Sequence, residues 1–379
     1  MPYWRLSAFY FFFFGSLGAF APYWSVYLHS LEFSPLQIGE LMAIMMATRI
    51  VAPNIWGWIA DHTGHRMRIV RIGCFLALLF FAGAFFGTSY AWLAAVMVLF
   101  SFFWNAALPQ FEAATLNHLG RDTHRYTQIR VWGSVGFIVV VAGLGPLLDR
   151  HGVGMLPAVC FFLMAGIWFA TLLAPNDDTQ ANDTTHGSLR DTLRKGPVLA
   201  VLVVCFLMQA SHGPYYTFYS LYLESHGYSR GAIGLLWALG VAAEVALYMV
   251  LHRIFHRYAL ELLLVVALAF TTLRWLVIGN FADNVVMLGL AQLLHAFSFG
   301  LYHAVAIQLI HRYFVGRSQG RGQALYSSFG FGAGGALGSL YSGYMWEAVG
   351  PTATFLAAAA CSAVATIIAV RLLWRKESR

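Results

Sequence analysis

Long apolar stretches alternate with short polar ones along almost the whole chain. Most stretches have roughly 20 residues or more, the length that an α-helix needs to cross the hydrocarbon core of a bilayer. Lipid offers no hydrogen bonds to bare backbone, so each stretch is predicted to be helical. The expected spans are twelve: 6–30, 36–59, 69–87, 90–117, 128–148, 155–174, 197–223, 231–251, 259–279, 285–311, 322–346 and 352–374.

The two halves of the chain repeat. A shift of 195 residues places 25–39 on 220–234 with seven of fifteen positions identical, several of them Ser, Tyr or Gly. A polar stretch, 175–196, divides the chain and is typical of a solvated linker. Two parallel six-helix repeats are the architecture of an alternating-access transporter. We therefore predict an all-α membrane protein with twelve transmembrane helices in two six-helix pseudo-symmetric halves, 1–174 and 197–379.

Composition and charge agree with this class. Only 10% of the 379 residues are charged and 59% are hydrophobic, whereas a soluble domain has about 25% charged residues. Of the Lys and Arg residues, 18 fall on one side of the predicted topology and 2 on the other. The excess marks the cytoplasmic side. We expect a monomeric multi-pass protein of the inner (plasma) membrane with both termini and the linker in the cytoplasm, and no nucleic-acid partner despite the net charge of +7.

Opposite charges interrupt two neighbouring spans. Glu112 lies near the end of the fourth apolar run, three residues after Pro109, and Arg130 opens the fifth. An ionisable side chain in a membrane span is costly, so it usually faces a cavity and a partner. We predict that Glu112, Arg130 and the nearby Asn105 contact a solute. The alternative is a salt bridge that only joins two helices.

Further polar and aromatic side chains lie within spans. Arg49 and Glu244 occupy equivalent positions of the repeat with opposite charge, and the role of Arg49 stays open. In the seventh span, Gln209, His212, Tyr216 and Tyr219 would share one helical face. His212 and Tyr216 are candidate solute contacts, and so are Tyr23 and Tyr27, which could instead be interfacial aromatic residues. The histidines have no metal-ligand spacing, so we expect no metal site.

A short loop after the second span carries the most specific motif. It reads Gly57-Trp-Ile-Ala-Asp61-His-Thr-Gly64-His-Arg66. Glycines permit a tight turn, and a carboxylate at a helix end can bind a helix N-terminus or an arginine. The loop resembles the cytoplasmic signature G-x-x-A-D-x-x-G-x-R of the major facilitator superfamily. The resemblance implies a gating role for Gly57, Asp61, Gly64 and Arg66.

Within that superfamily, Pro109-x-x-Glu112, Arg130-x-x-Gly133, Arg274 and Leu294-His295 resemble helices of lactose permease. The resemblance implies that Glu112 and Arg130 bind solute, and that Arg274 and His295, with Glu244, belong to a proton-coupling group. The chain departs from that pattern where helix seven lacks acidic residues and where Ser298 replaces a carboxylate. The resemblance therefore does not extend to lactose as the solute or to that proton route.

The chain resembles the phenylpropionate permease branch over nearly its whole length. The shared patterns are Pro22-Tyr-Trp24-Ser25-Val26-Tyr-Leu28, Arg130-Val-Trp132-Gly133-Ser134, Ala243-Glu244-Val245 and Arg274-Trp275. With one excess positive charge among the intramembrane groups and many aromatic residues, these patterns favour proton symport of an aromatic monocarboxylate such as 3-phenylpropionate. Symport of a sugar or nucleoside, or export of small drugs, are the alternatives.

The chain shows no motif of a membrane enzyme in its proper context. H-E-x-x-H does not occur, and the two formal G-x-S-x-G matches, at Gly227 and Gly316, fall between predicted helices with no strand before them. The G-x-G-x-x-G match at Gly330 lies inside a span, where it indicates close helix packing. A membrane sensor that does not transport could have the same two repeats. Measuring solute flux would distinguish such a sensor from a transporter. We expect no enzyme and no cofactor, with the proton gradient as the energy source and a small solute and the lipid bilayer as the only partners.

Overall fold

The computed structural model describes residues 3–120, 122, 125–176, 192–315 and 319–374. These residues form helices and their connections and contain no strand. The chain divides into two compact units: Met1–Thr184 with Ser229–Leu235, and Thr185–Tyr228 with Leu236–Arg379. Most of the expected linker, 175–196, lies outside the described residues. Each unit is described by itself below.

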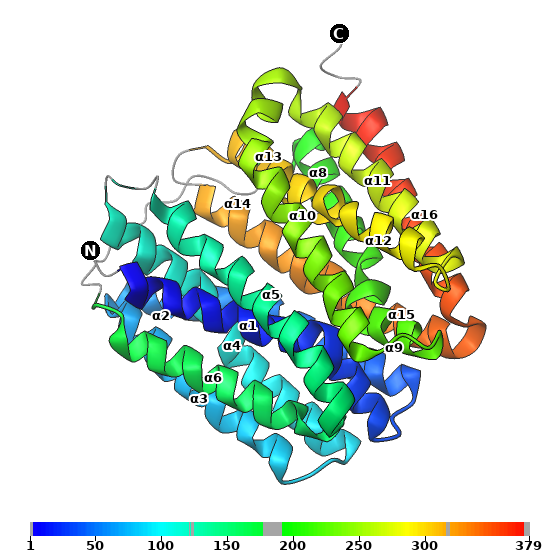
Figure 1. Ribbon diagram of the computed structural model, residues 1–379. Coiled ribbons are helices and arrows are strands. Elements are labelled where there is room, and N and C mark those ends of the chain that lie inside the picture. The colour runs from blue at the N-terminus through cyan, green and yellow to red at the C-terminus, as the bar shows by residue number, and fades with distance from the viewer. Residues whose placement is uncertain (1–2, 121, 123–124, 177–191, 316–318, 375–379) are drawn as a thin grey trace. The chain divides into compact units, whose positions relative to one another are not determined.

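The first unit consists of α1 to α6 and the start of α10, coloured blue to green in Figure 1. Its elements are α1 (Tyr3–Ser30), α2 (Pro35–Thr63), α3 (Arg66–Phe81), η1 (Ala82–Phe85), α4 (Tyr90–Leu119), α5 (Tyr126–His151), η3 (Val153–Met155) and α6 (Leu156–Leu173). Helix α1 packs on α5 and α6, α2 on α4, and α3 on α4 and α6. Most of α1 is buried, so it forms the centre of the unit.

The second unit contains the remaining elements. They are α8 (Gly196–Ser211), α9 (Gly213–Ser225), α10 (Arg230–Arg257, from Leu236 on), α11 (Leu260–Asn280), α12 (Val285–Leu293), η4 (Ala296–Leu301), α13 (Tyr302–Tyr313), α14 (Gln319–Leu325), η6 (Tyr326–Gly334), α15 (Gly335–Val349), α16 (Pro351–Ala369) and η7 (Val370–Trp374). The segments η4, η6 and η7 are π-helical. Helix α11 packs on α16 and η4, and α8 packs on α16 and η6.

Within the described residues, eleven helical segments are long and apolar enough to cross a membrane. They correspond to eleven of the twelve expected spans. The twelfth, 322–346, is the continuous run of α14, η6 and α15, which glycine and serine make less apolar. The predicted fold class, an all-α protein built of membrane-spanning helices, is confirmed.

Local chemistry explains how α2 begins and ends. The Ser34 hydroxyl accepts a hydrogen bond from the Gln37 backbone N–H, and the Gln37 side chain accepts one from the Ser34 N–H. This reciprocal capping satisfies two amides that have no partner within the helix. The helix ends where Gly64 adopts φ 68°, a conformation that glycine reaches without strain. The gating-loop motif therefore forms the junction between α2 and α3.

Three expected continuous helices are interrupted near their middle, and one of them is the eleventh span, which contains η6. The seventh span is divided at His212 into α8 and α9. Proline removes a backbone donor and disfavours the helical conformation of the residue before it, and Pro214 follows Gly213 directly. The tenth span contains the π-helical turn η4 between α12 and α13. A regular helical period is therefore interrupted at these places, although the Tyr216 N–H still donates to the His212 carbonyl oxygen at 3.0 Å.

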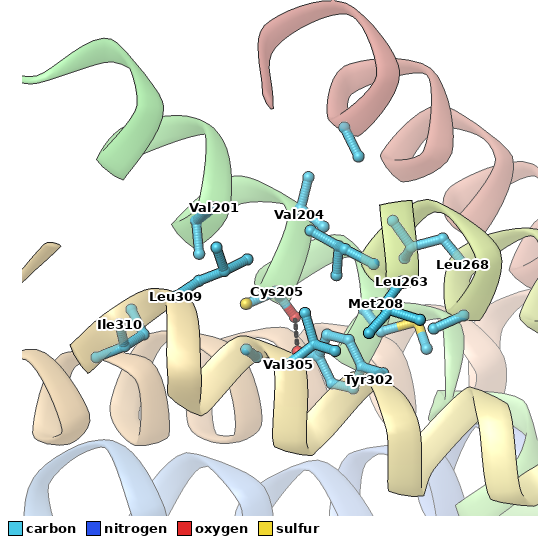
Figure 2. Close-up of a cluster of buried hydrophobic side chains, with 14 of the residues drawn as sticks. Val201, Val204, Cys205, Met208, Leu263, Leu268, Tyr302, Val305, Leu309 and Ile310 are labelled. Carbon is cyan, nitrogen blue, oxygen red and sulfur yellow. Dashed lines mark hydrogen bonds between the residues drawn. The ribbon is translucent and has the colours of Figure 1, made fainter. Parts of the chain in front are cut away.

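The core of the second unit fills the space between α8, α11 and α13 (Figure 2). Its labelled side chains are Val201, Val204, Cys205, Met208, Leu263, Leu268, Tyr302, Val305, Leu309 and Ile310. Tyr302 is fully buried, and its hydroxyl donates to the Cys205 carbonyl oxygen at 3.4 Å. Tyr302 thus belongs to the core and supports the helix that carries His295.

Glycines set the closest helix contacts. In the second unit, a Cβ added to Gly334 would lie 2.6 Å from the Phe206 carbonyl oxygen, and one added to Gly338 would lie 2.7 Å from that of Ala210. The glycine-rich stretch of the eleventh span therefore packs closely on another helix, as predicted, and that helix is α8. In the first unit, a Cβ on Gly136 of α5 would lie 2.1 Å from the carbonyl oxygen of Phe11 in α1.

Gly136→Ala is expected to destabilise the first unit. The Phe11 atoms that the added Cβ would meet all belong to the backbone, so α1 and α5 must separate to accept a methyl group. Overpacking of this kind costs roughly 1–3 kcal/mol. Gly143→Ala is the matched control on the same helix, because nothing lies within 4 Å of a Cβ there. Thermal unfolding of the two detergent-solubilised variants tests this. Equal melting temperatures would contradict the close contact.

Candidate solute-binding and proton-coupling sites

Glu112 of α4 and Arg130 of α5 face each other in the first unit. The Arg130 Nε lies 3.5 Å from Glu112 Oε1, and the side chains are 30% and 32% exposed. In the part of the chain that the structure describes, the terminal nitrogens Nη1 and Nη2 of Arg130 make no hydrogen bond. The outer edge of the guanidinium is therefore available to a ligand, and this edge is the planar fork that matches a carboxylate.

An aromatic ring supports the Arg130 guanidinium. Its Cζ lies 3.9 Å from the centroid of Phe14 and 5.6 Å from that of Tyr10, both on α1. A cation within about 6 Å of a ring face is attracted by the ring quadrupole. Gly133 makes room for this arrangement, because a Cβ there would lie 2.7 Å from both Arg130 Nη1 and Phe14 Cδ2. The ring and the glycine hold the fork in a fixed position.

Tyrosines complete the surroundings of Glu112. The Tyr126 hydroxyl donates to Glu112 Oε1 at 3.1 Å, and the Tyr10 hydroxyl donates to Thr115 Oγ1 at 3.1 Å. Tyr126 was not among the predicted site residues. Its position one helical turn before Arg130 was the available signal, because residues four apart share a helix face. Phe14 had no comparable signal in an apolar stretch.

The other predicted solute contacts of the first unit are Asn105, Tyr23 and Tyr27, and their side chains bond to or pack on other residues than Glu112 and Arg130. The Asn105 side-chain nitrogen donates to the Met45 carbonyl oxygen and to Thr48 Oγ1, so it joins α4 to α2 and leaves the amide oxygen for other partners. Tyr23 is buried, and its hydroxyl lies 3.0 Å from the Val141 carbonyl oxygen. Tyr27 is also buried, with its ring 5.0 Å from that of Trp24. Neither tyrosine contacts Arg130, and their solute-binding role stays a prediction.

Arg274 of α11 is fully buried in the second unit. It donates to the Ala291 carbonyl oxygen, to Ser298 Oγ at 2.9 Å and to Gln292 Oε1 at 3.2 Å. Tyr215 contributes its ring face, 4.2 Å from the Arg274 Cζ. All of these partners are neutral, and no ion pair to Arg274 occurs among the described residues. Sequence reasoning missed Gln292.

Glu244 of α10 lies against His295, which precedes η4. The His295 Nε2 is 3.5 Å from Glu244 Oε2, and the side chains are 6% and 15% exposed. The expected approach of Arg274 to Glu244 is not observed, because Ser298 and Gln292 occupy its guanidinium. Two glycines allow the close packing around Glu244 and His295. A Cβ on Gly300 would lie 2.9 Å from Glu244 Cγ, and one on Gly240 would lie 3.3 Å from His295 Cβ.

His212 lies at the break between α8 and α9. Its Nδ1 is 2.8 Å from the Met208 carbonyl oxygen, and its buried Nε2 has no hydrogen-bond partner in the described parts of the chain. Its ring stacks on Tyr216 at 5.7 Å. His212 and Tyr216 do lie together, as the spacing predicted. The polar Nε2 and the ring of Tyr216 suit the predicted solute contact, which remains a prediction.

The gating-loop motif forms an ion pair within itself. Arg66 Nη2 lies 2.7 Å from Asp61 Oδ1 across the α2–α3 junction. Gly57 lies against Gln110 of α4, whose Nε2 would be 3.3 Å from a Cβ there. Arg49 is half-buried in α2. The loop thus links α2, α3 and α4 at one end of the unit.

These features are those of a membrane carrier. Each unit is built of helices long enough to cross a membrane, and each contains charged side chains among those helices. The family model of the MFS_1-like family matches residues 3–357. The chain belongs to this family and is thus a transporter of the major facilitator superfamily, not an enzyme.

Two relatives match most of the chain. A probable 3-phenylpropionic acid transporter of Escherichia coli (strain K12) is 28% identical over 90% of this chain and 90% of its own length. The maltose permease of Geobacillus stearothermophilus is 27% identical over 98% of this chain and 94% of its own. The solved structure of the nucleoside transporter NupG superposes with a TM-score of 0.82, at 16% identity, covering 98% of this chain and 99% of that one. The structural likeness shows the fold alone.

Proposed function

We propose that this transporter takes up a small aromatic monocarboxylate, such as 3-phenylpropionate, together with protons. The observation that carries the proposal is the open fork of Arg130 above the Phe14 ring, with Nη1 and Nη2 not hydrogen-bonded by the described residues. A carboxylate fits the fork with two parallel hydrogen bonds. Aromatic side chains nearby suit the ring of the same solute. The relative named for 3-phenylpropionic acid supports this solute class.

The Glu244–His295 pair is the proposed proton-coupling group, with Arg274 beside it. A carboxylate and an imidazole can exchange a proton at 3.5 Å with a small movement or through a water molecule. The buried charge of Arg274 acts on both groups, since electrostatic effects are strong where water is excluded. A proton gradient would supply the energy for uptake.

A sugar or nucleoside is the second candidate. Glu112 and Arg130 together carry no net charge, and a carboxylate next to a guanidinium also suits vicinal hydroxyls. The match to the maltose permease covers 98% of this chain. The nucleoside transporter NupG has the same fold as this chain. A neutral solute would need no counter-ion, so the open fork of Arg130 would have a smaller role.

We propose the inner (plasma) membrane as the location, with both termini in the cytoplasm. The 18-to-2 distribution of Lys and Arg supports this orientation. The Asp61–Arg66 pair would then lie at the cytoplasmic end of the first unit. There it would bias the conformational equilibrium without contacting the solute.

Uptake by proteoliposomes tests the proposed function. Under an inward proton gradient, we expect accumulation of radiolabelled 3-phenylpropionate, which a protonophore dissipates. Maltose and uridine represent the second candidate, and 3-phenylpropionamide is the uncharged control of matched shape. Accumulation of maltose or uridine without any 3-phenylpropionate uptake would contradict the proposed solute.

A further inference from the structure

The solute-binding site of the first unit is electrically balanced before a solute arrives. Glu112 and Arg130 face each other through one contact, Nε to Oε1 at 3.5 Å. A monoanion that binds to the Arg130 fork would place two carboxylates around one guanidinium. The site would then hold one uncompensated negative charge inside a membrane helix bundle, which is strongly unfavourable.

We infer that Glu112 takes up a proton when a carboxylate solute binds to Arg130. The inference rests on the proposed solute class. The proton comes from water and bonds to a Glu112 carboxylate oxygen. Arg130 then forms its ion pair with the solute carboxylate instead of with Glu112. The complex keeps the net charge of the empty site. The solute and its proton thus travel together, and this proton is separate from the one proposed for the Glu244–His295 pair.

The geometry permits this exchange of partners. Glu112 Oε1 and Arg130 Nε do not form a hydrogen bond, and both side chains are about one-third exposed, so little interaction energy is lost when Arg130 turns to another carboxylate. Glu112 Oε2 has no hydrogen-bond partner among the described residues, so it is the oxygen to which a proton can add. The Tyr126 hydroxyl can still donate to Oε1 in the neutral acid.

The charged and titratable groups around Glu112 within the unit come from two helices. Arg130 and Tyr126 reach it from α5, and Tyr10 faces the same space from α1. Neither tyrosine is a cation, and Arg130 keeps its charge at any accessible pH. Glu112 is therefore the acid of this site to which we assign the proton.

Calorimetry of the purified transporter in detergent tests the inference. Binding of 3-phenylpropionate is measured in buffers of different ionisation enthalpy, because the dependence of the heat on buffer counts protons. Between about pH 6 and pH 8, the solute carboxylate is ionised. We expect uptake of about one proton per solute and a loss of about tenfold in affinity per pH unit towards the alkaline end.

Glu112→Gln mimics the protonated acid. It is expected to bind the solute without proton uptake, with an affinity that does not change over the same pH range. Glu40→Gln is the matched control: the same substitution in the same unit, at a carboxylate that accepts a hydrogen bond from the Tyr90 hydroxyl. It should keep the proton uptake of the parent. 3-Phenylpropionamide, which lacks the charge, should cause no proton uptake in any variant.

Tyr126→Phe provides a second test that leaves both charges in place. Loss of a donor to the Glu112 carboxylate makes its charged form less favourable, so the alkaline loss of affinity should move to higher pH. Binding by the parent without proton uptake, or unaltered proton uptake in a folded Glu112→Gln variant, overturns the inference and leaves the solute class standing. Absence of any 3-phenylpropionate binding by the parent overturns the solute class and the inference together.

Discussion

Arg130→Lys is expected to weaken binding of 3-phenylpropionate by roughly ten- to a hundredfold, although the positive charge is kept. Lysine offers a point charge on a flexible stem, whereas the guanidinium presents two parallel donors in a fixed plane. Lysine would also lose the stacking on Phe14, which lies 3.9 Å from the Arg130 Cζ. Equilibrium binding to the detergent-solubilised protein measures this loss directly.

The matched control is Arg150→Lys at the far end of the same helix, where the side chain is exposed. It should bind the solute as the parent does. Gly133→Ala tests the position of the fork with no change of charge. The added Cβ would lie 2.7 Å from both Arg130 Nη1 and Phe14 Cδ2, so one of these side chains must move. We expect this variant to lose affinity for 3-phenylpropionate as well, but by less than Arg130→Lys does. Unchanged affinity in both Arg130→Lys and Gly133→Ala would show that Glu112 and Arg130 form a bridge with no role in binding.

The pattern of long apolar stretches predicted the helices well, because a segment surrounded by lipid must satisfy its backbone hydrogen bonds within a helix. The expected span 36–59 became α2, extended to the cap at Ser34 and the turn at Gly64. The break at His212 was missed, although Gly213-Pro214 is a recognised helix-breaking signal. The π-helical turns η4 and η6 could not be predicted, because they depend on how neighbouring helices pack and not on a local residue pattern.

The candidate sites were only partly predictable for a related reason. Opposite charges identified Glu112 and Arg130, because a charge within an apolar stretch stands out against its surroundings. Their neighbours Phe14 and Tyr126 did not stand out. Spans that are apolar all round carry almost no amphipathic signal, so the sequence does not show which way each helix is rotated.

The second unit shows the same limit. Arg274 and Glu244 were expected to meet, but Glu244 lies against His295 and Arg274 donates to Ser298. The π-helical turn η4 places Ser298 against Arg274 and leaves His295 to face Glu244. A regular helical period across residues 295–302 would assign these faces differently. The chemistry could be predicted from residue types, whereas the pairing depended on one local change of helix geometry.

Glu244→Gln is expected to abolish accumulation of solute against a gradient while exchange across the membrane continues. A tightly coupled symporter must not reorient empty while it is protonated, since that step would leak protons. Glutamine imitates a carboxyl group that never releases its proton. The empty carrier would therefore stop returning, but the loaded carrier could still move in both directions. Net uptake and counterflow of labelled 3-phenylpropionate in proteoliposomes separate these two steps.

Glu347→Gln serves as the control, because the same substitution at this exposed position of α15 should leave net uptake intact. Gly300→Ala probes the pair without removing a charge, since its Cβ would lie 2.9 Å from Glu244 Cγ and push the carboxylate from His295. It should reduce net uptake more than counterflow. If Glu244→Gln still accumulates the solute, and a protonophore still dissipates the gradient, the coupling proton does not bind to Glu244. Proton linkage would then belong to Glu112, whose proton accompanies the solute, or to His295.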